Sequence, residues 1–157
     1  YASNSCPIVC IAGDGSIMMN LQELQTISSS NLPIKIVIIN NNGYVSINQA
    51  QRKYFNGEEV GAGPKSGIIL PDFEKLSKGF GLHYCKIDTL KNLDKKIDAF
   101  MDVKGPAICE VIVDENQEFS PKLSAKILDN GQMVSPPLED LSPFLTSEEL
   151  ESNMIRS

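Results

Sequence analysis

The stretch that decides the fold is Pro7-Ile8-Val9-Cys10-Ile11-Ala12-Gly13-Asp14-Gly15-Ser16, in which a nearly continuous apolar run meets an acidic turn bounded by glycines. A second apolar run, residues 34–39, leads into the turn Asn40-Asn41-Asn42-Gly43. Short apolar runs rich in β-branched residues are typical of strands covered on both faces, as in parallel sheets. Residues 16–39 lie between the Gly-Asp-Gly turn and the asparagine turn, and they include a helical pattern before the second strand.

The rest of the chain continues this alternation. Apolar runs at 82–87 and 107–113 predict two further strands. Apolar residues at helical spacing predict helices around residues 21–27, 46–54, 73–80 and 93–101. The resulting order is strand, helix, strand, helix, helix, strand, helix, strand. That order predicts an α/β fold with an open parallel sheet and helices on both of its faces.

Three local signals predict where helices begin and end. Asn20 followed by Glu23 resembles a capping box at the start of the first long helix. Asp72, which follows a proline, is a predicted N-cap for the helix at 73–80. The pair Gly105-Pro106 is predicted to stop the helix that begins near residue 93.

Composition limits the possible functions. The 157 residues fit one domain, and their net charge of −6 is dispersed along the chain, which argues against a nucleic-acid partner. No run of 18 apolar residues and no signal peptide is present, so we expect no membrane span and a cytoplasmic location. All four cysteines lie in apolar runs without a CxxC pair, and we predict buried free thiols at Cys6, Cys10, Cys85 and Cys109.

Two segments interrupt the alternation. Residues 44–71 form a long connection with a glycine-rich part at 56–67, and such connections are usually functional or mobile. Residues 115–157 carry four of the nine prolines and one strong helix candidate at 147–154. We expect this irregular C-terminal extension to wrap over a core of residues 1–114 within the same domain. Because the chain starts Tyr1-Ala2-Ser3 just before a core strand, we also expect it to be a fragment of a longer protein.

The two polar turns predict a binding site. Ligands in open parallel sheets bind beyond the carboxyl ends of the strands, so neighbouring strands would bring both turns to one crevice. Mg²⁺ prefers about six oxygen ligands, few of which need be charged. Asp14 offers one carboxylate, Asn41 an amide oxygen and Gly43 a backbone carbonyl. Two diphosphate oxygens and a water would complete this set.

Glycines and amides in the first turn suit a phosphate group. Gly13 and Gly15 let the backbone approach closely, and the N–H groups of Gly15 and Ser16 at a helix start can donate to phosphate oxygens. Either turn alone would more often be an ordinary turn than a site. Together, at this spacing and each after a strand, they predict a magnesium-diphosphate site.

The phrases GDGSIMMNLQEL and LPIKIVIINNNGY resemble the signature of thiamine diphosphate (ThDP) enzymes, and within them the acetolactate synthase large subunit and its relatives. The resemblance implies the ThDP-binding fold and the cofactors ThDP and Mg²⁺. It implies that Asp14, Asn41 and Gly43 bind the metal and that Ser16 contacts the diphosphate. The wider implied cofactor-binding set is Gly13, Asp14, Gly15, Ser16, Ile17, Asn41, Gly43, Tyr44 and Val45. For the last two residues, packing of a short helix is an equally good interpretation.

Later phrases extend the resemblance with less specific matches: GPKSGIILPDFEKLSKGFG, GPAICEVIVD and SPPLEDLSPFL. Members of the family also have an N-terminal pyrimidine-binding domain, which carries a glutamate that activates the cofactor, and a middle domain. Neither is found in these residues, so we assign no catalytic residue here and expect this chain alone to be inactive. The resemblance implies a parent homodimer or homotetramer, in which the pyrimidine-binding domain of a partner subunit completes the site. It also implies an exposed apolar patch where the missing domains dock.

For the parent, the resemblance implies a transferase that acts as a carboligase. It would decarboxylate a 2-oxo acid such as pyruvate and ligate the resulting enamine to an acceptor. Some decarboxylases of the family carry a carboxylate where this chain has Ile47, which favours the ligase type. The alternatives are another ThDP-dependent 2-oxo-acid decarboxylase or lyase, a binding module without chemistry, and a dinucleotide-binding module. The last lacks the GxGxxG motif after the first strand.

Overall fold

A computed structural model describes residues 6–117 and 120–154 of the chain. The chain divides into two compact units, residues 1–116 and 117–157. The expected packing of residues 115–157 on the core, as part of one domain, stays a prediction.

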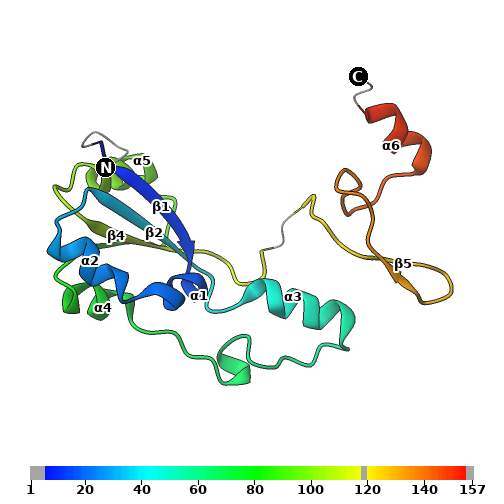
Figure 1. The fold of residues 1–157 in the computed structure, drawn as a ribbon, viewed down its shortest axis with the longest axis horizontal. Coiled ribbons are helices and arrows are strands. Elements are labelled where there is room, and N and C mark those ends of the chain that lie inside the picture. Colours follow the sequence, from blue (N-terminus) through cyan, green and yellow to red (C-terminus); the bar gives the residue numbers. More distant parts are fainter. Residues whose placement is uncertain (1–5, 118–119, 155–157) are drawn as a thin grey trace. The chain divides into compact units, whose positions relative to one another are not determined.

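The first unit is built on a four-stranded parallel sheet (Figure 1). Its strands are β1 (Ile8–Gly13), β2 (Ile34–Asn40), β3 (His83–Ile87) and β4 (Ala107–Ile112). Their order across the sheet is β1-β2-β4-β3, so β2 and β4 are central. The predicted strands are all present, and the α/β fold class with a parallel sheet is confirmed.

Helices cover both faces of this sheet, as predicted. The helices α2 (Glu23–Ser29) and α4 (Phe73–Gly79) pack on one face, where Leu24 and Phe73 meet Ile36, Ile38 and Ile108. The helix α5 (Leu93–Met101) packs on the other face. There its Phe100 meets three buried residues of β3 and β4, namely Ile87, Ala107 and Cys109. Successive strand residues point to opposite faces, which explains why β2 and β4 are apolar almost throughout.

Shorter elements complete the first unit. The sharp bend after β1 contains α1 (Asp14–Ile17) and the 3-10 turn η1 (Met18–Asn20). The long connection contains α3 (Val45–Tyr54) and the 3-10 turn η2 (Pro64–Ser66).

Of the predicted helix signals, the N-cap at Asp72 is confirmed, because its Oδ1 accepts from the Lys75 N–H at 3.0 Å. The capping box at Asn20 is wrong: Gln22 precedes α2 and makes no side-chain capping bond. The backbone is already helical at Ile17, Met18 and Gln22, so Asn20 does not stand at a free helix start. The stop at Gly105-Pro106 is also late, because α5 ends at Met101.

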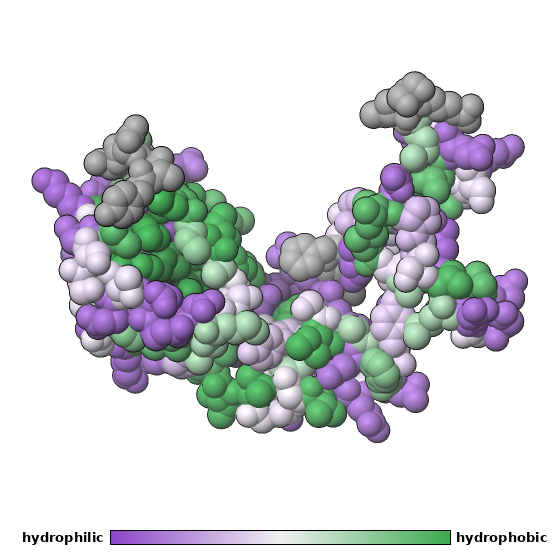
Figure 2. Space-filling view, in the orientation of Figure 1, coloured by the Kyte–Doolittle hydropathy of each residue, from purple (hydrophilic) through white to green (hydrophobic). Residues whose placement is uncertain are grey.

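The edge strand β1 differs from the expectation of burial on both faces. Ile8, Val9 and Ile11 are exposed, the last at 70%. The predicted burial of the thiols is therefore wrong for Cys6 and Cys10, which are exposed, whereas Cys109 is buried and Cys85 half-buried. Figure 2 shows hydrophobic residues gathered over the β1 side of the first unit. This is the kind of exposed apolar patch that the resemblance implied, and its role in docking stays a prediction.

The second unit has little regular structure. It contains a hairpin of β5 (Lys126–Ile127) and β6 (Met133–Val134), and the helix α6 (Ser147–Asn153). Thr146 caps α6 by accepting from the Glu149 N–H at 3.2 Å. Inside this unit Lys126 pairs with the buried Asp140 carboxylate. Within the described residues, no helix has the length and hydrophobicity needed to cross a membrane.

Candidate functional site

The two polar turns lie at the same edge of the sheet. Strands β1 and β2 are parallel neighbours, and Gly13 is in register with Ile39. The acidic turn after Gly13 and the asparagine turn that begins at Asn40 therefore leave the sheet side by side. This confirms the condition on which the predicted crevice depended.

Asp14 joins the two turns. The residue is 2% exposed, and its Oδ1 accepts from the Gly15 N–H at 2.7 Å. Its Oδ2 accepts from the N–H groups of Asn41 and Gly43, at 3.1 and 2.9 Å. A buried carboxylate is stable only when it is well hydrogen-bonded, and here three backbone amides satisfy it. These bonds bring Asp14, Asn41 and Gly43 together as predicted, although the Gly15 amide that we expected to face a phosphate donates to Asp14.

Asn41 carries an unsatisfied oxygen at this turn. Its Oδ1 is buried and has no hydrogen-bond partner among the described residues. A buried amide oxygen without a donor costs roughly 1–3 kcal/mol, so such an atom needs an explanation. A cation bound by this oxygen would supply one.

Close backbone contacts shape both turns. A Cβ on Gly15 would lie 2.5 Å from Cε1 of Tyr44, so the tyrosine ring occupies the space that any side chain here would need. Gly43 has φ +137°, and a Cβ there would lie 2.6 Å from the carbonyl oxygen of Ala62. The Tyr44 N–H donates to that same oxygen at 2.7 Å. Gly43 thus requires glycine, because both its φ and fixed backbone atoms exclude a side chain, whereas a side chain at Gly15 would have to displace the Tyr44 ring.

The remaining predicted residues have different environments. Ser16 is exposed in α1, whereas Ile17 packs against the core cluster around Leu24. Val45 is buried at the start of α3 and lines a cavity beside the asparagine turn. The structure therefore brings Ile17 into the hydrophobic core, and packing explains its presence without a ligand.

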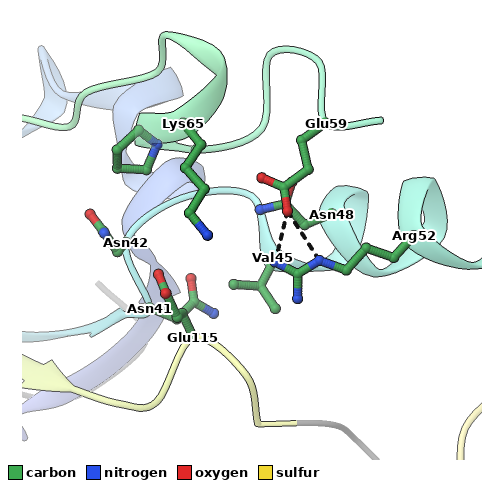
Figure 3. A pocket seen from close by; sticks show the side chains of 10 residues that line it. Asn41, Asn42, Val45, Asn48, Arg52, Glu59, Lys65 and Glu115 are labelled. Atoms are coloured by element: carbon green, nitrogen blue, oxygen red, sulfur yellow. Dashed lines mark hydrogen bonds and ion pairs between the residues drawn. The ribbon is translucent and has the colours of Figure 1, made fainter. Parts of the chain in front are cut away.

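The cavity, of about 120 Å³, lies between the asparagine turn, α3 and the loop around η2 (Figure 3). Arg52 of α3 and Glu59 form an ion pair at 2.7 Å on one side of it, and Lys65 points into it. The Oδ1 of Asn48 in its wall is a second buried oxygen without a partner among the described residues. The side of the asparagine turn that faces this cavity is thus surrounded by polar groups.

Sequence reasoning missed how the glycine-rich loop holds the turn. The Ser66 hydroxyl oxygen accepts from the amides of Ala62 and Gly63, at 2.9 and 3.0 Å. Gln51 of α3 both donates to and accepts from the backbone of Val60. These bonds fix Ala62, whose carbonyl receives the Tyr44 amide. The sequence shows only the glycine content of this loop.

Comparison with known proteins identifies the family. Residues 2–111 match the family model described as thiamine pyrophosphate enzyme, C-terminal TPP binding domain. The acetolactate synthase large subunit of Pyropia yezoensis is 34% identical over 127 residues, which are 81% of this chain and 21% of that protein. The isozyme 2 large subunit of Escherichia coli K12 is 33% identical over 135 residues, covering 86% and 23% respectively. The chain thus spans about a fifth of the length of these relatives.

A solved structure shows the same fold. The thiamine diphosphate-dependent 4-hydroxybenzoylformate decarboxylase of Rhodococcus jostii RHA1 aligns with a TM-score of 0.61 over 69% of this chain and 20% of that one, at 21% identity. Taken with the family match and the converging turns, this leaves the dinucleotide-binding alternative without support. The chain belongs to the thiamine pyrophosphate enzyme family, as a C-terminal TPP-binding domain of the acetolactate synthase large-subunit type.

Proposed function

We propose that this domain binds the diphosphate of ThDP through Mg²⁺, and that Asp14, Asn41 and the carbonyl of Gly43 hold the ion. The observation that carries the proposal is that the Asp14 carboxylate, which binds both turns, lies next to an Asn41 side-chain oxygen that lacks a hydrogen-bond partner among the described residues. Asp14 is hydrogen-bonded to the amides of Asn41 and Gly43, and the buried Asn41 Oδ1 next to them has no partner among the described residues.

The available donors fit a hard divalent cation. Within the described part of the chain, no three His, Cys, Asp or Glu side chains gather to hold a metal. The proposed set has a single carboxylate and two neutral oxygens, which suits an ion whose remaining ligands are diphosphate oxygens. A larger number of carboxylates would repel the diphosphate.

In this proposal the residues of the chain bind and orient rather than transfer protons. Asp14 and the asparagine turn fix the diphosphate end, while Gly13 and Ser16 of the acidic turn lie next to Asp14 and allow close backbone approach, and Gly15 is covered by the Tyr44 ring. Tyr44 packs over Gly15, and Val45 lines the cavity beside the asparagine turn. When bound, ThDP supplies the carbanion chemistry.

For the longer protein we propose an acetolactate synthase-like carboligase, a cytoplasmic transferase that decarboxylates a 2-oxo acid such as pyruvate and joins the remaining fragment to an acceptor. It would act as a homodimer or homotetramer, with the pyrimidine-binding domain of a partner subunit at the site. The sequence similarity to acetolactate synthase large subunits supports this proposal. Product analysis with pyruvate would separate it from a simple decarboxylase or lyase, since only the carboligase yields acetolactate.

The metal site itself is tested by isothermal titration calorimetry, in which Mg²⁺ is added to the chain in the presence of ThDP. Asn41→Ala removes an oxygen that makes no hydrogen bond within the described residues, so it should weaken Mg²⁺ binding by at least about tenfold while leaving the fold intact. Glu115→Gln is the matched control, because this carboxylate lines the neighbouring cavity but lies outside the proposed set. Equal Mg²⁺ affinity in wild type and Asn41→Ala would refute the assignment.

A further inference from the structure

An acidic residue lies in the middle of the central strand β4. Glu110 is flanked by Cys109 and Val111 in an otherwise apolar strand, and it is 7% exposed. Taking a carboxylate out of water is costly unless hydrogen bonds compensate it. A strand that tolerates this cost in its centre calls for an explanation in terms of what the carboxylate holds.

Both carboxylate oxygens of Glu110 are engaged, each with a different neighbouring strand. Oε1 accepts from the side-chain amide of Asn40, at the end of β2, at 2.5 Å. Oε2 accepts from the hydroxyl of Tyr84 on β3. Burial, together with the Glu110 carboxylate, raises the pKa of this hydroxyl above its ordinary value, which keeps it protonated and able to donate. Glu110 thus connects β3, β4 and β2.

Asn40 passes this connection on to the asparagine turn. Its Oδ1 accepts from the Asn42 N–H at 2.9 Å, which makes an Asx-type turn. Asn42 has φ +66°, in the left-handed region where asparagine is tolerated better than most residues. The amide donors to Asp14, those of Asn41 and Gly43, lie on either side of Asn42. The side-chain orientation of Asn40 therefore affects the whole turn.

We propose that Glu110 is a positioning residue, whose carboxylate orients Asn40 and thereby preorganises the Asn41–Gly43 turn for its ligand. The ligand part of this inference rests on the proposed function, whereas the ordering of the turn does not. Each step is a hydrogen bond between named atoms, from Glu110 to Asn40 and from Asn40 to Asn42. Hydrogen bonds to a charged group are stronger than neutral ones, so the bond from Asn40 to the Glu110 carboxylate is expected to be stronger than the bond from the Asn42 amide to Asn40.

A second buried charge gives a matched comparison. Lys35 on β2 is 2% exposed, and its ammonium donates to the carbonyls of Val103 and Gly105, at 2.7 Å for the latter. Lys35 pairs with Ala107 at the start of β4, so it lies at the opposite end of the strands from the asparagine turn. Replacing either side chain leaves buried hydrogen-bond partners unpaired and should lower the free energy of unfolding, but only loss of Glu110 should disturb the turn.

The test compares residue-resolved amide hydrogen exchange by NMR in the metal-free chain, for wild type, Glu110→Leu, Glu110→Gln and Lys35→Met. In Glu110→Leu the protection of the Asn41, Asn42 and Gly43 amides should fall by at least about tenfold, the effect of losing one bond to a charged group. Glu110→Gln keeps an acceptor for Asn40 and should stay within about threefold of wild type. Lys35→Met should leave the turn amides unchanged relative to the rest of the sheet.

Turn protection in Glu110→Leu equal to wild type would overturn the inference, as would an equal loss in Lys35→Met. Should Glu110→Leu fail to fold by circular dichroism, Asn40→Asp decides instead, since it keeps the oxygen that accepts from the Asn42 amide but removes the donor to Glu110, so protection of the turn amides must fall as in Glu110→Leu. Mg²⁺ titration with ThDP is a separate readout. If wild type does not bind Mg²⁺, the proposed function fails while the exchange data still decide the role of Glu110. If wild type binds, Glu110→Leu should bind at least about tenfold more weakly, and Glu110→Gln nearly as well as wild type.

Discussion

Substituting Gly43 by alanine should be among the most damaging single-methyl changes in this domain. The residue has φ +137°, where an L side chain is strained by about 1–3 kcal/mol. The added Cβ would lie 2.6 Å from the Ala62 carbonyl oxygen and 3.1 Å from the Gly63 Cα, both of them backbone atoms. Overpacking of this kind costs about 1–3 kcal/mol more, so the free energy of unfolding should fall by about 2–6 kcal/mol.

The same substitution at Gly57 separates the cost of backbone strain from the cost of a steric clash. Gly57 also has a positive φ, +81°, but a Cβ there would meet nothing within 4 Å. Gly57→Ala should therefore cost only about 1–2 kcal/mol, the penalty for a left-handed L residue. The difference between the two variants isolates the contact of the asparagine turn with the glycine-rich loop.

Urea unfolding followed by circular dichroism measures both variants. Total stability of a domain is about 5–15 kcal/mol, so Gly43→Ala should remain folded at low urea with a lower midpoint. Where it is folded, it should also lose Mg²⁺ affinity, because relieving the contact with Ala62 would move the backbone amide of residue 43 away from Asp14. If Gly43→Ala is no less stable than Gly57→Ala, the close approach of Ala62 to the turn is not real and the described shape of the site is wrong.

Two further predictions concern other parts of the first unit. Burial lowers the pKa of the Lys35 ammonium below its ordinary 10.5. The folded state then releases this proton at a lower pH than the unfolded state, so the free energy of unfolding should rise with pH toward 10.5. Urea unfolding of wild type and Lys35→Met between about pH 8 and 10 checks this. The free energy of unfolding of wild type minus that of Lys35→Met should rise with pH, and a difference that stays constant or falls contradicts the prediction. In thiol labelling with a chromogenic disulfide, Cys6 and Cys10 should react in the native chain and Cys109 only in urea; rapid native labelling of Cys109 would contradict its burial.

Much of the fold could be predicted because its signals are local. The apolar runs of β1 to β4 and the stripes of α4 and α5 depend on side chains within one element, and each was found within a few residues of its observed bounds. The predicted capping box at Asn20 is wrong for the opposite reason: its pattern uses only neighbouring residues, whereas helical backbone upstream removes the free helix start. Exposure at Cys10 also depended on which strand lies at an edge, which no local pattern records.

The residues of the two turns follow from the sequence alone, because few turns combine glycines, one carboxylate and paired asparagines directly after apolar strands, and their wording resembles the signature of the family. Tertiary structure decided how those residues are arranged. The parallel pairing of β1 with β2 brings Asp14 to the amides of Asn41 and Gly43. Sheet order places Glu110 beside Asn40, and loop closure brings Ala62 onto Tyr44. These contacts join residues 18 to 70 positions apart, and such pairings depend on global packing rather than on the preferences of any short segment.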